Sequence, residues 1–131
     1  PPSPVTGTLS RELSMAWPVP TLVFEPEPDD GPVEVSAIYD VPADRRDDFL
    51  AAMPAVGRSR RRTGARNWHL YRSADRDGRY VEQFVVPSWS EYRRQHRDRW
   101  TEYDHDNVAR VLAMTTTGIP DERHLFSTNI R

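Results

Sequence analysis

The apolar residues of this 131-residue chain change their spacing along its length, and the order of these changes limits the folds open to it. Over residues 33–41 they alternate with polar residues, the period of two that is typical of a strand with one buried face. Over residues 43–62 they recur every three or four positions, which predicts an amphipathic helix that Pro54 should kink or interrupt. Residues 67–72 and 79–86 are rich in aromatic and β-branched residues and flank an Asp-Gly turn signal, so they should form a hairpin.

A second helix is expected after Pro87, because Ser88 and Glu91 match a capping box and bulky residues then follow at steps of three and four. Glycine and proline should end this helix before a last strand over residues 124–130. The resulting order predicts an α+β fold of the ferredoxin-like type, β-α-β-β-α-β, with an antiparallel sheet and both helices on one face. A second subunit that covers the bare face would give a dimeric α/β-barrel arrangement.

The first 32 residues are rich in proline and polar residues, and we interpret residues 1–32 as a linker before one ferredoxin-like domain over residues 33–131. Within this lead, residues 15–24 carry enough apolar bulk to dock on the domain as an extended, ordered strap. The chain starts at Pro1 without a methionine, as a segment cut from a longer protein would. Removal of a tag could produce the same start.

The composition limits the partners of the chain. A hydrophobic fraction of 37% and a mean hydropathy of -0.77 are lean for a globular domain, so burial of a sheet face in a homodimer would add needed stability. The formal net charge of -2 argues against a nucleic-acid partner. The lack of cysteine excludes disulfides and thiolate sites, and we expect no metal and no cofactor. No stretch approaches the roughly 18 apolar residues of a membrane span.

Four strings of residues are distinctive: Phe49-Leu50-Ala51-Ala52-Met53, the arginine run before Thr63-Gly64-Ala65, Trp68-His69-Leu70-Tyr71-Arg72, and the run from Phe84 to His96. These strings resemble the cytoplasmic C-terminal region of bacterial major facilitator efflux transporters, in the group that includes relatives of enterobactin exporters. The resemblance covers about residues 17–125, with Tyr92 at a position where the group would have histidine. More distantly, the region is similar to the antibiotic biosynthesis monooxygenases, which are small dimeric ferredoxin-like proteins.

Each resemblance implies a different function. The transporter resemblance implies a non-catalytic dimerisation or regulatory domain at the cytoplasmic face of the plasma membrane, attached to membrane-embedded transporter helices of the same polypeptide. The monooxygenase resemblance implies a cofactor-independent enzyme that oxidises a small aromatic molecule.

All 18 basic residues are arginine, which indicates a GC-rich, actinobacterial coding bias.

The candidate site residues come from the second strand and the second helix. Asn67, His69 and Tyr71 should share one strand face, where they could orient an aromatic substrate or meet a partner subunit. His96 could serve as a general base, or it could be a buried histidine held by one hydrogen bond. The catalytic candidates are therefore Asn67, His69 and His96, the candidates for ligand binding are Trp68, Tyr71, Glu82 and Trp100, and no residue is assigned to a metal.

Two charged clusters allow a structural and a functional interpretation. Arg58, Arg60, Arg61 and Arg62 should lie in the last turns of the first helix, where positive charge complements the helix dipole. In a domain held beneath a membrane, the same cluster could contact anionic headgroups. The run from Asp104 to Asp106 could ligate a metal, but adjacent helical residues point in different directions, which favours a solvated helix start.

Overall fold

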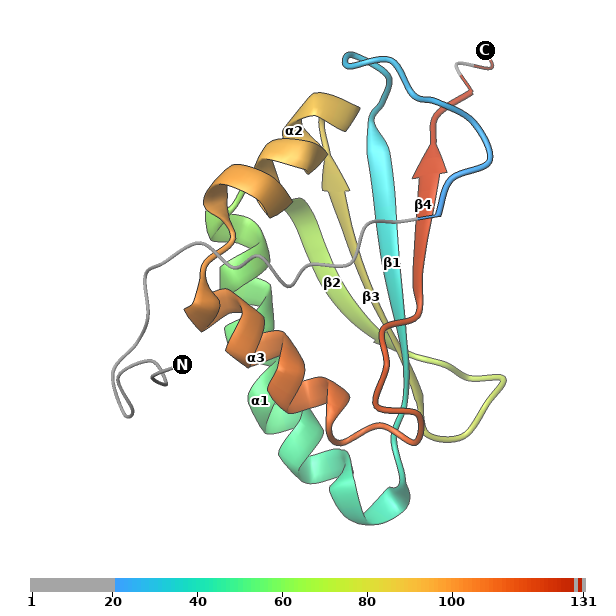
Figure 1. The fold of residues 1–131 in the computed structure, drawn as a ribbon. Helices are drawn as coiled ribbons and strands as arrows, with labels where there is room; N and C mark the ends of the chain where they lie inside the picture. The colour runs from blue at the N-terminus through green and yellow to red at the C-terminus, as the bar shows by residue number, and fades with distance from the viewer. Residues whose placement is uncertain (1–20, 129, 131) are drawn as a thin grey trace.

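The computed structural model describes residues 21–128 and residue 130. A four-stranded antiparallel sheet forms one layer, and the helices form a second layer on one face of it (Figure 1). The strand order is β2-β3-β1-β4, which places the first strand beside the last one. The ferredoxin-like α+β fold predicted from the sequence is therefore confirmed.

The element boundaries follow the predicted order of strands and helices. The strands are β1 (Val33–Asp40), β2 (Arg66–Arg72), β3 (Arg79–Val86) and β4 (Glu122–Phe126). The helical elements are the short turn η1 (Ala43–Arg45), α1 (Arg46–Arg62), α2 (Trp89–Arg94), the π-helical turn η2 (Gln95–Arg99) and α3 (Glu102–Leu112). The last strand begins two residues earlier than predicted and ends at Phe126 rather than at residue 130.

The two central strands set the register of the sheet. β1 pairs with β3 along its whole length, from Val33 opposite Val86 to Asp40 opposite Arg79. The hairpin of β2 and β3 is less regular, because the register shifts between Arg66 and His69. Asn67 lies in this irregularity with a positive φ of 53°, a conformation that asparagine tolerates better than most residues.

The first helix is continuous, so the predicted interruption at Pro54 is wrong. α1 runs through Pro54 to Arg62. A proline removes one intrahelical hydrogen bond and frees a carbonyl one turn earlier, here that of Leu50. Both residues are exposed, so water can satisfy that carbonyl, while Phe49 and Met53 on the opposite side are fully buried and hold the helix against the sheet.

The predicted second helix is divided into separate pieces. The helix that begins after Ser88 passes into η2 and ends at Trp100. The hydroxyl of Ser88 accepts from the amide of Glu91, as predicted, whereas the carboxylate of Glu91 accepts from Arg94 and Arg99 instead of closing the capping box. Thr101 then opens α3 through a complete capping box, in which its hydroxyl and the carboxylate of Asp104 each accept from the other's amide. The break turns Trp100 into the core, where its side chain is fully buried.

The core consists of two apolar clusters, and the tryptophan of β2 contacts both. The larger cluster lies between α1, α3 and the sheet, and the smaller lies between α2 and the sheet, with Trp68 packed against each. Residues 15–20 of the predicted strap lie outside the described residues. Leu22 packs against the smaller cluster, and the ring of Phe24 meets that of Phe126 edge to face at 5.3 Å.

The face of the sheet away from the helices carries no helix in the described part of the chain (Figure 1). Cross-strand neighbours on this open face include Tyr71 opposite Val81, and Val81 opposite Ile38. Tyr71 is 48% exposed and Leu125 on β4 is 55% exposed. Large apolar side chains therefore face solvent along the open face.

Residues 21–128 and residue 130 include no helix with both the length and the apolar character that crossing a bilayer requires.

Candidate functional site

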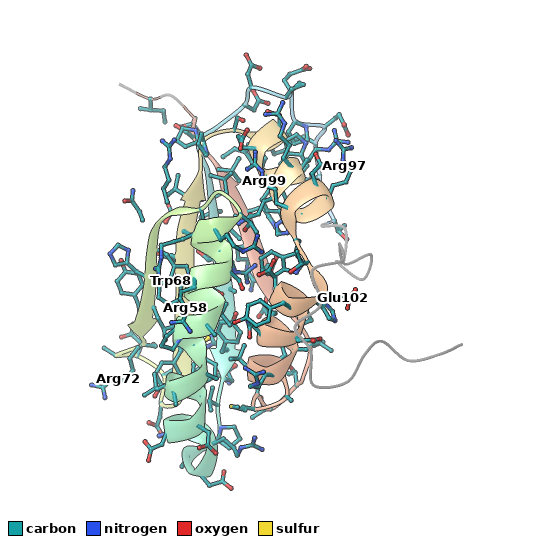
Figure 2. All side chains as sticks on the ribbon, turned by 90° about the vertical axis from the view of Figure 1, so that its left-hand side faces the viewer. Arg58, Trp68, Arg72, Arg97, Arg99 and Glu102 are labelled. Carbon is teal, nitrogen blue, oxygen red and sulfur yellow. The ribbon has the colours of Figure 1, made fainter. Side chains whose placement is uncertain are left out.

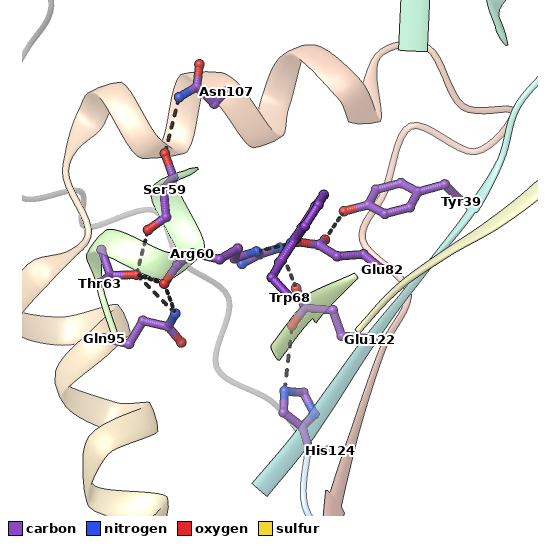
Figure 3. Close-up of polar contacts among 10 residues, drawn as sticks. All are labelled: Tyr39, Ser59, Arg60, Thr63, Trp68, Glu82, Gln95, Asn107, Glu122 and His124. Carbon is purple, nitrogen blue, oxygen red and sulfur yellow. Dashed lines mark hydrogen bonds and ion pairs between the residues drawn. The ribbon is translucent and has the colours of Figure 1, made fainter. Parts of the chain in front are cut away.

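A buried carboxylate, that of Glu82, lies at the centre of the polar residues between the sheet and the helices (Figure 3). Glu82 is on the helix-facing side of β3 and is fully buried. One oxygen accepts from the hydroxyl of Tyr39 at 2.7 Å and from Nη2 of Arg60 at 3.2 Å. The other accepts from Nε1 of Trp68 at 2.7 Å and from Nε of Arg60 at 2.9 Å. Four donors thus surround the carboxylate, which is how a buried charge avoids a large desolvation cost.

The partner of this carboxylate, Arg60, is equally buried. Its guanidinium lies 5.0 Å from the ring centre of Phe84 and 5.2 Å from that of Trp100, so two aromatic rings and one carboxylate surround it. Nη2 also lies 3.9 Å from Glu122 on β4. The arginine therefore connects α1 with both an inner and an edge strand of the sheet.

The pKa values of this cluster favour its ionised form. Burial would raise the pKa of Glu82, but the charge of Arg60 and the hydrogen bonds from Arg60, Trp68 and Tyr39 outweigh burial and lower it. Burial would lower the pKa of Arg60, but the carboxylate of Glu82 and other neighbouring charges raise it instead. Burial and the charge of Glu82 both raise the pKa of Tyr39. At neutral pH the cluster is a carboxylate and a guanidinium with a neutral phenol.

Aromatic and imidazole groups extend the cluster towards α2. Nε2 of His124 lies 3.6 Å from Glu122 and 2.8 Å from the hydroxyl of Tyr92, and the ring of Tyr92 meets that of His96 edge to face at 4.3 Å. Burial, the charge of Arg60 and His124 lower the pKa of His96 to about 2. His96 is therefore neutral at physiological pH and is a weak base.

The backbone around Arg60 is held by side chains from the other helices (Figure 3). Nε2 of Gln95 donates to the carbonyl of Arg60 at 3.3 Å and to the hydroxyl of Thr63 at 3.0 Å. Nδ2 of Asn107 on α3 donates to the hydroxyl of Ser59 at 3.2 Å. These contacts fix the end of α1 from two sides, and with it the direction of the Arg60 side chain.

The structure separates the predicted site residues into two groups. Glu82, Trp68, His96 and Trp100 all lie on the helix-facing side of the sheet. His69 and Tyr71 are on the open face, where their rings stack at 5.7 Å and both are exposed. Asn67 is exposed in the irregular part of β2, and its carbonyl lies 3.0 Å from Nδ1 of His69. One pocket shared by the His69 side and the His96 side would have to pass through the sheet.

Two grooves of the surface contain none of the predicted site residues, although His124 lines the first. One, of about 620 Å³, is lined by residues 29–31 and by the end of β4. Another, also about 620 Å³, lies between the start of α1 and the β2–β3 hairpin. Among the described residues, no three His, Asp or Glu side chains come together as ligands of a metal ion would.

Sequence reasoning did not assign Arg60, Tyr39, Glu122 or His124 to this cluster. The alternating pattern of the first strand does place Tyr39 on its buried face. Arg60 resembles its exposed neighbours in the sequence, because residues 58–62 contain four arginines including Arg60 itself. The available signal was helical spacing, since Arg60 lies seven residues after the buried Met53 and four after the buried Val56.

Comparison with protein families gives one match that spans almost the whole chain. A family profile described as transmembrane secretion effector, from the major facilitator group, matches residues 3–130. This match confirms the transporter resemblance seen in the sequence. No curated protein gives a significant match.

Solved structures with the same fold have low sequence identity to this chain. A candidate antibiotic biosynthesis monooxygenase from Caulobacter crescentus is 17% identical, with a TM-score of 0.64 over 78% of this chain and 94% of that protein. A protein from Mycobacterium tuberculosis is 23% identical, with a TM-score of 0.61 over 76% and 98%. A cofactor-independent oxygenase from Streptomyces nogalater is 16% identical, with a TM-score of 0.58 over 75% and 94%. Similarity at this level shows a common fold, as the resemblance to the antibiotic biosynthesis monooxygenases implied.

Replacement of Glu82 tests how far the fold depends on the buried ion pair. Glu82→Gln leaves the guanidinium of Arg60 buried without a counter-charge and should lower the free energy of unfolding by about 3–5 kcal/mol. Asp106→Asn, at an exposed position of α3 and away from the open face of the sheet, should change it by less than about 0.5 kcal/mol. Urea unfolding followed by circular dichroism measures both. Equal effects of the two variants would contradict a central role for the pair.

The low pKa of His96 predicts a specific dependence of stability on pH. In the unfolded chain this histidine binds a proton below about pH 6.5, whereas in the folded chain its pKa is about 2. Its contribution to stability is therefore fully present above pH 6.5 and is lost as the pH falls towards 2, by about 1.4 kcal/mol per pH unit. Between pH 6.5 and 5 the unfolding free energy should fall less in His96→Gln than in the wild type. Parallel pH curves of the two proteins would show that this histidine is not protected from protonation.

Proposed function

Because the chain belongs to the transmembrane secretion effector family, we propose that it is the dimerising, non-catalytic domain of a major facilitator efflux transporter. It would lie at the cytoplasmic face of the plasma membrane, joined to membrane-embedded helices of the same polypeptide. The observation that carries the dimer is the open face of the sheet.

A reading frame that encodes long apolar segments upstream of residue 1 would support the attachment to membrane-embedded helices, and a start codon a few residues upstream would contradict it.

The open face has the composition of a subunit interface. Tyr71, Val81 and Ile38 form an apolar row across three strands. A second row is mixed, with the apolar Val85 and Leu125 on either side of Glu34 and with Arg66 opposite Val85. Between these rows lie polar side chains, among them Gln83 and Ser36, which are direct cross-strand neighbours. Tyrosine and apolar groups mixed with hydrogen-bonding groups are typical of such interfaces. A second copy of the chain would cover this face and complete a two-layer barrel.

The buried polar cluster favours a structural role over catalysis. The carboxylate of Glu82 already accepts four hydrogen bonds, so it would have to break a buried ion pair before it could take a proton from a substrate. His96 has a pKa of about 2, which is far from the near-neutral value of an efficient general base. The two imidazoles that could act on a substrate, His69 and His96, lie on opposite sides of the sheet.

A second candidate function is oxidation of a small aromatic molecule without a cofactor. It is favoured by the common fold with the oxygenase from Streptomyces nogalater and by the aromatic groups around Arg60, with Trp68, Tyr92 and Trp100 on the helix-facing side. In this case an electron-rich phenolic substrate would lose a proton and then react with oxygen. Oxygen uptake with a panel of polycyclic phenols, compared between the wild type and Trp100→Ala, separates this function from the first.

Substitution on the open face tests the dimer. Tyr71→Asp places a carboxylate in the apolar row and should raise the dimer dissociation constant about thirtyfold or more, as expected for loss of an interface hot spot. Leu50→Asp is a matched control, because Leu50 on α1 is 44% exposed and Tyr71 is 48% exposed. Analytical ultracentrifugation measures both variants. A wild-type chain that stays monomeric, or a control that dissociates as readily, would contradict the proposed interface.

A further inference from the structure

Positive charge is concentrated at the end of the molecule where α1 ends and α2 begins. The chain has a formal net charge of -2, yet seven arginines come from the end of α1, from α2 and from η2. We call their side chains, of which Arg99 is partly buried and the others are exposed, the arginine surface: Arg58, Arg61, Arg62, Arg93, Arg94, Arg97 and Arg99. Figure 2 shows Arg97 and Arg99 at the α2 end and Arg58 further along α1.

Contacts between the elements bring these arginines onto a common surface. Nη1 of Arg99 donates to the carbonyl of Thr63 at 3.1 Å, directly after the end of α1. The side chain of Gln95 bonds to the same turn. The last turn of α1 and the turn η2 are therefore in direct contact.

Carboxylates compensate only part of this charge. Arg94 and Arg99 both pair with Glu91, and Arg62 pairs with the buried Asp104. These pairs have a structural role, since they hold the helix ends together. The pair of Arg97 with Asp98 is exposed on both sides, at 65% and 55%, and such pairs contribute little and exchange readily.

Three members of the arginine surface have no ion pair to any described residue: Arg58, Arg61 and Arg93. Arg61 lies over the ring of Trp68 at 5.4 Å, which leaves the edge of its guanidinium open to an anion. On the side of α2, the acidic segment 25–30 bounds the surface, because the amides of Trp89 and Ser90 donate to the carbonyls of Asp30 and Pro28. The arginine surface is therefore positive with acidic residues along one edge. This uneven charge would give the domain a defined orientation towards an anionic partner.

We propose that the arginine surface docks this domain on the anionic headgroups of a phospholipid bilayer. The inference rests on the proposed function, which keeps the domain close to a membrane. Guanidinium groups bind phosphate oxygens through two parallel hydrogen bonds, and a basic residue near an anionic bilayer raises partitioning about fivefold. A bilayer fits better than a nucleic acid, because nucleic-acid-binding domains are usually basic as a whole, whereas a local basic surface is enough for a domain that its attachment already keeps beside a membrane.

Vesicle sedimentation with the 131-residue chain tests this docking. The test variant carries Arg58→Gln, Arg61→Gln, Arg93→Gln and Arg97→Gln, none of which pairs with a buried carboxylate and all of which lie away from the open face of the sheet. The control variant loses the same number of charges elsewhere through Arg45→Gln, Arg72→Gln, Arg76→Gln and Arg110→Gln, all exposed. The vesicles contain phosphatidylglycerol mixed with phosphatidylcholine, or phosphatidylcholine alone.

We expect the wild type to bind the anionic vesicles and the test variant to bind them at least tenfold more weakly, with the control variant close to the wild type. Binding should fall as salt is added. Equal binding to both vesicle types, equal losses in the two variants, or tighter binding to a short DNA duplex than to the vesicles would each overturn the proposal. A chain that dimerises without binding vesicles refutes only the docking, whereas a monomer that binds vesicles refutes only the dimer.

Discussion

The buried ion pair of Arg60 and Glu82 is the interaction on which the arrangement of the helices depends. A guanidinium inside a small domain is tolerated only when it is paired and hydrogen-bonded, and this one has a bidentate carboxylate and two aromatic rings around it. The carboxylate in turn takes donors from β1 and β2. A shift of α1 along the sheet would break several of these bonds together. The ion pair therefore selects one position of α1 on the sheet more than it adds to the net free energy of unfolding.

This polar centre also accounts for the lean composition of the chain. Arg60, Glu82, Gln95 and Asp104 occupy fully buried positions that apolar residues fill in most domains of this size. Their hydrogen bonds offset desolvation without adding much net stability. Burial of the open face in a dimer would supply apolar area that the interior lacks, so the polar core and the proposed interface are two parts of one explanation.

The sequence predicted the fold well because the fold depends on periodicity. The alternation in the first strand, the hairpin and the N-cap at Ser88 are local signals, and each was confirmed. The break at Trp100 was missed, although Thr101 and Asp104 form a capping box of their own, because the aromatic spacing continues across it. The burial of Glu82 could not be predicted from the sequence, since a strand glutamate is buried only where an arginine from another element pairs with it.

The arginine run at the end of α1 shows why a charge cluster in a sequence has no single meaning. Successive helical residues are about 100° apart, so Arg60 faces the sheet while Arg58, Arg61 and Arg62 face outwards. Arg60 contributes to the core and cannot contact a membrane. The exposed neighbours of Arg60 can contact a membrane, and their replacement leaves the ion pair of Arg60 and Glu82 intact. The two roles can therefore be separated by mutation even though the residues are adjacent in the chain.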